Sequence, residues 1–359
     1  MSIEKKEEKQ KNKQNKPDNQ IWFFTMHPTP RSSRSSRSSR PSRSTRLTPV
    51  GFHFPRVRGR TPARNQEDHP QRDIDVRSEI HAPYDAIVLS SGGARGIAQF
   101  GALDVVYTQY PEVVENTRYF IGSSAGAVLA TLLAMGVTPR DAFVGYVVPF
   151  KYRRSIRLDM LGTLFGIETS GSLDSFLAGV VDRDITFRDV YEEYGTVLSI
   201  LGTNINKATS VIFDAVRTPD MPVFDALRIS CSVPLLFPAV RVDGEYFVDG
   251  AVSDPFPVGV AMDVYGCRHI LGLRFDHFAA SLSADGNWKL DDYIGAVIDT
   301  MIHSSSMNVP ARRGVVADVV TVVTPDDISG IDFSLSTKKK YELFDAGAES
   351  MISYIKKHS

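Results

Sequence analysis

The sequence predicts an α/β sandwich with a mostly parallel central sheet. From Asp85 onward, short β-rich runs alternate with amphipathic helical stretches, and this alternation is typical of parallel strands joined by helices. No internal repeat with a period of roughly 20–50 residues is visible in this part of the chain, so a repeat architecture is not expected. With 359 residues, of which 42% are hydrophobic and 23% charged, the chain is long and apolar enough to bury a sizeable core.

The expected elements follow from local composition and from the spacing of apolar residues. The expected strands are 86–90, 118–122, 196–203, 209–213, 269–275 and 318–323, and the expected helices are 97–110, 125–135, 139–148, 223–231, 257–265, 291–306 and 338–356. A hairpin is expected at Asp243-Gly244, because Asp-Gly between two apolar runs favours a tight primed turn. The uncharged run 119–139 is long enough to span a bilayer, but glycines and serines interrupt it, so we expect a strand and a helix instead.

The N-terminal 60 residues of the chain are basic, whereas the rest of the chain is acidic. Residues 1–60 hold 15 Lys+Arg and four Asp+Glu, whereas the rest of the chain holds 26 Lys+Arg and 38 Asp+Glu. The polar composition of residues 1–82 predicts a disordered tail, which leaves residues 83–357 as the folded domain. Within the tail, arginine recurs at every third position from Arg31 to Arg40. This run predicts either contact with anionic lipid or nucleic acid, or a solvated tail without a partner.

Other compositional features indicate which partners and locations are not expected. The chain has only two cysteines, which excludes a disulfide framework and a four-thiolate zinc site. No His/Cys/Asp cluster has the spacing of metal ligands, so we expect no metal and no cofactor. Neither a signal peptide nor a membrane-spanning helix is recognisable. We therefore expect an intracellular protein, either cytoplasmic or peripheral at membranes.

Residues 122–126 form the strongest local motif. They read G-x-S-x-G, with Gly122, Ser124 and Gly126 at its fixed positions, between an expected strand and an expected helix. A nucleophile elbow requires this strand-turn-helix context. Ser124 would then lie at a helix N-terminus, where the helix dipole and free amides favour developing negative charge. The alternative is a small-residue turn that only lets a helix and a strand pack closely.

A second glycine-rich turn connects the first expected strand to the first expected helix. Its amides carry little side-chain bulk and lie at a helix start, which suits an oxyanion hole or a phosphate cradle. A dinucleotide-binding fingerprint is not expected, because Ser91 stands where the first glycine of that fingerprint is required. The side chain of Arg95 either orients this loop or meets an anionic head group, or it is a surface arginine paired with an acid. The candidate oxyanion-hole residues are Gly92, Gly93, Ala94, Arg95 and Gly96.

Three Asp-Gly pairs compete for the role of a catalytic base. Asp243 belongs to the expected hairpin turn, and Asp285 lies in a polar loop. Asp249 ends a β-run and is followed by Gly250 and Ala251, so its carboxylate can be buried and still be approached. Asp249 is therefore the base candidate, with Asp254 as its nearest rival.

These three motifs, taken in order, resemble those of the patatin-like phospholipase family. The resemblance covers about residues 85–356, and it includes the connecting segments 185–187, 226–238 and 249–257. The sequence departs from the family pattern at Ser91, where some members carry a glycine, and at Pro255, where an asparagine is usual.

The resemblance implies a three-layer α/β/α fold and hydrolysis of lipid acyl esters at a membrane interface. It makes Ser124 the nucleophile and Asp249 the direct proton acceptor, with an oxyanion hole formed by amides near Gly93, Ala94 and Arg95. An acyl-enzyme on Ser124 would then be cleared by water. The expected substrates are phospholipids or neutral glycerides.

Two other functions stay open from the residues alone. The first is an esterase with a Ser-Asp-His triad, in which His269, His277 or His303 supplies the imidazole. The second is a lipid-binding scaffold without activity. Residues 150–167, which carry Arg153, Arg154 and Arg157 among apolar side chains, form either a lid or interfacial patch for anionic head groups or a solvated connector.

Overall fold

The fold is built on one mixed sheet. The computed structural model describes residues 83–275, 293, 295–297, 300 and 312–358. In these residues the strand order is β5-β6-β3-β2-β1-β7-β8, and β4 pairs with β3. The pairs β3-β2, β2-β1, β1-β7 and β7-β8 are parallel, whereas β4, β5 and β6 add antiparallel pairs. The strands are β1 Ala86–Leu89, β2 Tyr119–Ser123, β3 Val197–Asn204, β4 Thr209–Asp214, β5 Val240–Val242, β6 Glu245–Asp249, β7 His269–Phe275 and β8 Val316–Val322.

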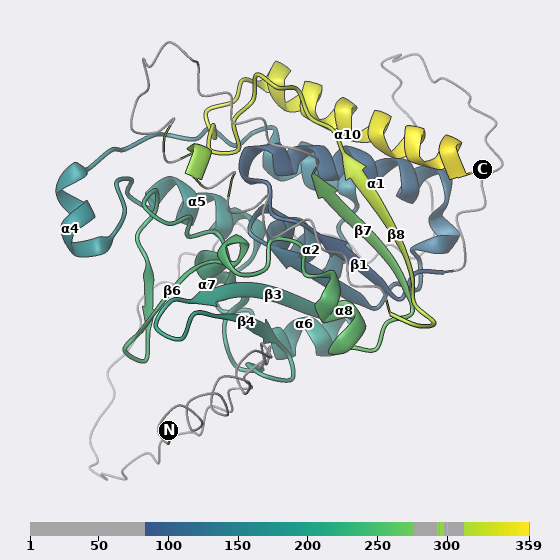
Figure 1. The fold of residues 1–359 in the computed structure, drawn as a ribbon, viewed down its shortest axis with the longest axis horizontal. Coiled ribbons are helices and arrows are strands. Elements are labelled where there is room, and N and C mark those ends of the chain that lie inside the picture. The colour runs from purple at the N-terminus through teal and green to yellow at the C-terminus, as the bar shows by residue number, and fades with distance from the viewer. Residues whose placement is uncertain (1–82, 276–292, 294, 298–299, 301–311, 359) are drawn as a thin grey trace, which may run out of the picture. The chain divides into compact units, whose positions relative to one another are not determined.

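Helices cover both faces of this sheet, which gives a three-layer α/β/α sandwich. Helix α8 packs on one face against alternate side chains of the central strands, including Val88 and Ile121. Helices α1, α2 and α10 pack on the other face, where α10 runs alongside α1 (Figure 1). The helices are α1 Ile97–Gln109, α2 Ala125–Ala134, α3 Pro139–Ala142, α4 Leu161–Leu164, α5 Gly171–Val180, α6 Phe187–Tyr194, α7 Val223–Ser230, α8 Val258–Asp263 and α10 Thr337–His358.

Burial explains why β1 has the uninterrupted apolar sequence AIVL. Every residue of β1 and β3 is buried, because a central strand between two helical layers has no solvent-facing side. The parallel register pairs Leu89 of β1 with Gly122 of β2. The loops that follow these two strands therefore leave the sheet at the same edge, which is where open α/β sheets bind their ligands.

Most of the elements expected from the sequence are confirmed. All six strands are present with ends shifted by at most two residues, and the Asp243-Gly244 turn joins β5 to β6. The run 119–139 forms β2, a turn and α2, as expected. No helix within the described part of the chain is both long and apolar enough to cross a bilayer.

Two parts of the expectation differ from the structure or cannot be compared with it. Helices α4, α5 and α6 were not expected: α4 is a single turn, whereas α5 and α6 are as long as the expected helices α2 and α7. The expected helix 291–306 lies mostly outside the described residues, and the tail 1–82 lies wholly outside them.

Candidate active site

Ser124 lies at a sharp turn between β2 and α2. Its backbone angles are φ 54° and ψ −123°, a conformation that costs energy for a residue with a side chain and is typical of functional turns. The turn is possible because Gly126 has no side chain: a Cβ there would lie 2.3 Å from the carbonyl oxygen of Leu89. Residues 122–126 therefore have the strand-turn-helix geometry that was expected for them.

Asp249 lies within hydrogen-bond distance of this serine. The Ser124 hydroxyl donates to Asp249 Oδ2 over 2.7 Å, and the Ala251 amide donates to Asp249 Oδ1 over 2.8 Å. The backbone of Asp249 is held as well, because its amide donates to the carbonyl of Ser232 over 2.9 Å. Both members of the pair are buried, with exposed fractions of 5% for Ser124 and 2% for Asp249. The predicted nucleophile and base thus form a direct contact.

The surroundings of Asp249 make its carboxylate unusually basic. Burial raises the pKa of Asp249 from its usual 3.8 to about 7, and the hydrogen bonds from Ser124 and Ala251 oppose this rise. Burial dominates because a low-dielectric environment destabilises the charged carboxylate more than two donors can stabilise it. A carboxylate with a pKa near neutrality is suited to accept a proton from a hydroxyl group.

Ser230 is a further site residue, and it was not predicted from the sequence. The amide of Ser124 donates to Ser230 Oγ over 2.9 Å, and Ser230 is the last residue of α7. This contact fixes the backbone of the nucleophile from a third element. A signal for it was present, since Ser230 is one of the two serines in segment 226–238, which resembles a family segment.

The glycine-rich loop lies beside the elbow at the same edge of the sheet. Gly93 has a φ of 53°, and the Ala94 amide donates to the carbonyl of Gly330 over 2.7 Å. The Arg95 amide donates to the carbonyl of Gly92 over 3.1 Å. Two of the three amides expected to form an oxyanion hole are therefore engaged by protein carbonyls in this conformation.

The side chain of Arg95 supports the loop. It is buried, with an exposed fraction of 5%, and its Nε donates to the carbonyl of Ile328 over 2.7 Å. Of the alternatives set out from the sequence, this geometry fits a residue that orients the loop. It does not fit a surface arginine.

An apolar cavity of about 130 Å³ opens beside Ser124. Ala94 and Ala125 form its wall next to the serine, and six aromatic side chains line the rest of it. A cavity of this lining suits a hydrocarbon chain, because apolar groups gain free energy by leaving water. The aromatic side chains that line it are Phe100, Phe150, Tyr152, Phe176, Phe237 and Phe333.

The rival catalytic residues are placed differently. His269 is the first residue of β7, and the parallel register aligns Ile270 with Ala86 at the start of β1. His269 therefore lies at the edge of the sheet opposite to Ser124, so it cannot serve as the base. His277 and His303 lie outside the described residues. Burial raises the pKa of Asp254 to about 7, but the carboxylate that contacts Ser124 is that of Asp249.

No cluster of three or more metal-ligating side chains occurs among the residues that the structure describes.

Comparison with known proteins identifies the domain. Residues 87–262 match the family model described as patatin-like phospholipase. A "Probable lipid hydrolase 463L" of Invertebrate iridescent virus 6 is 27% identical over 293 residues, which are 77% of this chain and 90% of that protein. An uncharacterized protein of Acanthamoeba polyphaga mimivirus is 25% identical over 286 residues, which are 74% of this chain and 91% of that protein. Among solved structures, VipD from Legionella pneumophila aligns with a TM-score of 0.47 and 14% identity, over 77% of this chain and 67% of that chain. By its residues 87–262, this chain belongs to the patatin-like phospholipase family.

Proposed function

We propose that this protein hydrolyses acyl ester bonds of phospholipids or neutral glycerides, with Ser124 as nucleophile and Asp249 as general base. The observation that carries the proposal is the hydrogen bond of 2.7 Å from Ser124 Oγ to Asp249 Oδ2. A serine hydroxyl is a weak nucleophile at neutral pH and needs a base within this distance. The raised pKa of Asp249 supports the same role.

The first half of the reaction forms an acyl-enzyme. Asp249 takes the hydroxyl proton while Ser124 Oγ bonds to the ester carbonyl carbon. The Gly93 amide, together with the dipole of α2, stabilises the negative oxygen of the tetrahedral intermediate. When the bond to the leaving alcohol breaks, Asp249 returns the proton to the alcohol oxygen.

The second half releases the acid. A water molecule gives a proton to Asp249 as its oxygen bonds to the acyl carbon, and Ser124 Oγ leaves with the proton that Asp249 returns. The sum is one ester and one water consumed, with one alcohol and one carboxylic acid formed. The apolar cavity beside Ser124 would hold the acyl chain in both halves.

Removing the nucleophile tests this proposal. Ser124→Ala should lower the turnover of a soluble fluorogenic ester by up to about 10⁶-fold, and lipidomics of a membrane extract incubated with each protein should show lipid loss with the wild type alone. Ser123→Ala is the matched control, because the side chain of Ser123 is fully buried next to Gly250 and plays no part in the scheme. A folded Ser124→Ala protein that kept more than a few per cent of the wild-type rate would exclude Ser124 as the nucleophile.

A further inference from the structure

One segment of the domain is unusually exposed. Residues 153–165, which we call the flap, are all exposed except the half-buried Met160. The flap contains the single turn α4, which projects away from the sheet on the left of Figure 1. An excursion of this length with almost no buried residue does not contribute to the core, so its sequence is free to serve another purpose.

The flap is nevertheless held firmly at its base. The Arg157 amide donates to the carbonyl of Ile167 over 2.6 Å, and the Thr169 amide donates to the carbonyl of Ser155 over 3.1 Å. The carboxylate of Glu168, only 2% exposed, accepts a hydrogen bond from Arg154 Nε over 2.9 Å. A buried carboxylate that pairs with the flap fixes its direction, so the flap presents a defined surface.

That surface is rich in large apolar side chains. Leu158 is 62% exposed, and four more apolar side chains of the flap are exposed by at least 38%. Leu235, which is 44% exposed, is paired with Gly166 at the flap's end. Such a concentration of apolar groups in water marks an interaction site. Together with Leu158, its members in the flap are Ile156, Leu161, Leu164 and Phe165.

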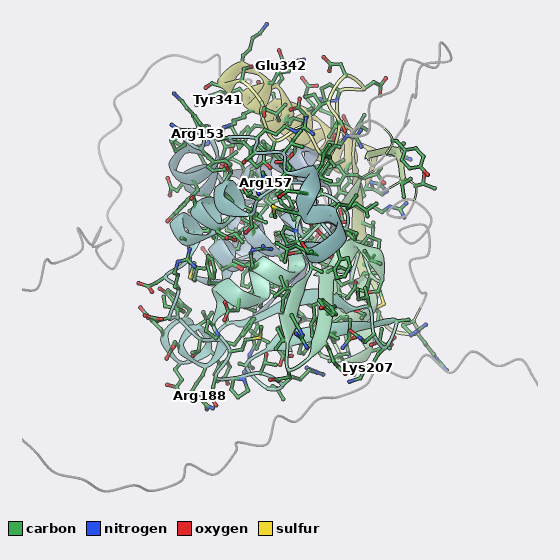
Figure 2. The ribbon with its side chains drawn as sticks, turned by 90° about the vertical axis from the view of Figure 1, so that its left-hand side faces the viewer. Arg153, Arg157, Arg188, Lys207, Tyr341 and Glu342 are labelled. Atoms are coloured by element: carbon green, nitrogen blue, oxygen red, sulfur yellow. The ribbon has the colours of Figure 1, made fainter. Side chains whose placement is uncertain are left out.

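Basic side chains accompany these apolar groups. Residues 151–165 carry Lys151 and three arginines against a single acidic residue, Asp159, although residues 61–359 as a whole hold 26 Lys+Arg and 38 Asp+Glu. Figure 2 faces this side of the domain, with Arg153 and Arg157 labelled on it. Arg157 pairs with Asp159, whereas Lys151 and Arg153 are exposed beside the flap's start. Residues 151–165 are therefore a basic segment within a part of the chain that is acidic overall.

The flap also adjoins the cavity of the candidate active site. Phe150 and Tyr152, which immediately precede it, line the cavity together with Ser124. At its other end, the Ile167 amide donates to the carbonyl of Leu235 over 3.0 Å, and Val233 lines the cavity as well. Whatever binds the flap is therefore brought to the cavity.

We propose that the flap docks this protein on membranes that contain anionic lipid. Leu158, Leu161 and Leu164 enter the boundary between head groups and acyl chains, while Lys151 and Arg153 meet the negative head groups. A bilayer fits both features at once, because it offers an apolar interior beneath an anionic surface. The docking does not depend on the proposed hydrolysis, and its test separates the two.

Vesicle flotation of the full-length protein tests the docking. The vesicles contain phosphatidylcholine alone or with a quarter of phosphatidylglycerol. The triple variant Leu158→Ser, Leu161→Ser and Leu164→Ser should lower partitioning onto the anionic vesicles at least about tenfold, because each leucine buries apolar surface on insertion. The variant Lys151→Glu with Arg153→Glu should lower it by more than the roughly fivefold effect of losing one basic group, and high salt should weaken wild-type binding.

Matched controls lie away from the flap. Val216 and Ile205 are 76% and 48% exposed, so Val216→Ser with Ile205→Ser removes comparable apolar groups. Arg188→Glu with Lys207→Glu reverses two charges at the opposite end of the view in Figure 2. These controls should bind vesicles like the wild type. Since all variants keep the basic tail, any difference between them belongs to the flap.

Three results would overturn the docking. Flap variants that bind anionic vesicles like the wild type would exclude the flap as a membrane surface. Equal binding to neutral and anionic vesicles would exclude anionic lipid as its partner. A dimer of the wild type that the leucine variant dissociates, with unchanged vesicle binding, would make the flap an interface between two copies. Turnover of the soluble ester is measured for every variant: its absence in the wild type contradicts the proposed hydrolysis, whereas flap-dependent vesicle binding would still support the docking.

Discussion

Ser124 Oγ and Asp249 Oδ2 lie 2.7 Å apart although 125 positions of sequence separate the two residues. Strand β3 explains how they meet. Leu201 of β3 pairs with Ser123 at the end of β2, and the next residue, Gly202, pairs with Asp249 at the end of β6. One strand therefore aligns a parallel neighbour and an antiparallel neighbour so that both end at the same point.

We expect Asp249→Asn to abolish activity without unfolding the domain. Asparagine keeps the shape of the side chain and an oxygen for the Ala251 amide, but it cannot accept the proton of Ser124. A positioned base contributes typically about 10²–10⁴ to the rate, so kcat/KM for a soluble ester should fall by at least this factor. Circular dichroism spectra of the variant and the wild type check that the variant is folded.

Replacing the histidines distinguishes the dyad from a triad. The combined variant His269→Gln, His277→Gln and His303→Gln should keep most of its activity, since in a dyad these side chains take no proton. Loss of the imidazole of a triad is as damaging as loss of its serine. A folded triple variant without activity would therefore establish a triad in place of the direct Ser-Asp pair.

The rate should depend on pH through Asp249. Its pKa is raised to about 7, and only the ionised carboxylate accepts a proton. The kcat/KM of a soluble ester should therefore rise about tenfold per pH unit below pH 7 and level off above it. A profile that was flat from pH 5 to pH 8 would contradict this assignment of the base.

The contribution of Asp249 to the free energy of unfolding should fall with rising pH, whereas the rate should rise. The folded state holds the Asp249 proton up to about pH 7, whereas the unfolded chain releases it near the usual 3.8. The wild type therefore loses free energy of unfolding as the pH rises from about 4 to about 7, and the loss stays constant above that range. Asp249→Asn lacks this loss, so its advantage in thermal stability over the wild type should grow between pH 4 and pH 7. An advantage that shrank over this interval would show that the buried carboxylate is stabilised by its surroundings.

Gly93→Ala should damage both the fold and the activity. Gly93 has a φ of 53°, and a Cβ there would lie 2.0 Å from the carbonyl oxygen of Gly330. The left-handed conformation alone costs a residue with a side chain about 1–2 kcal/mol, and the clash displaces the loop that we assign to the oxyanion. Gly145→Ala is the control, since a Cβ at that position would meet no atom within 4 Å apart from its chain neighbours and its own helix backbone. Equal melting temperatures and equal rates for the two variants would contradict the importance of this loop geometry.

Deletion of residues 1–80 tests the proposed division into a tail and a domain. Every motif lies after this point, so a soluble truncated protein should hydrolyse soluble esters at the wild-type rate. If the basic tail contacts anionic lipid, the truncated protein should also bind anionic vesicles less tightly, and high salt should remove the difference. A folded truncation without ester turnover would show that the tail completes the site.

The sequence by itself determined the local features of this protein. Strand-turn-helix signals at residues 90–96 and 122–126 depend on neighbours within a few positions, because glycines and apolar runs act through local backbone sterics. The three family motifs likewise pointed to Ser124 and Asp249. Helices α5 and α6 were not predicted, although α6 begins at a capping box formed by Thr186 and Asp189, which is a local signal for a helix start.

Only the tertiary structure decided which distant groups meet. The register on β3 brings Asp249 to Ser124, α7 brings Ser230 to the Ser124 amide, and the segment before α10 brings the Gly330 carbonyl to the Ala94 amide. The pKa of Asp249 also belongs to this level, because burial by remote residues causes its rise. The exposure of the flap also depends on tertiary structure. Its apolar residues could equally have been buried in a core, but the packing of the rest of the domain leaves them in contact with water. Such outcomes depend on contacts between residues far apart in the sequence, which local patterns do not specify.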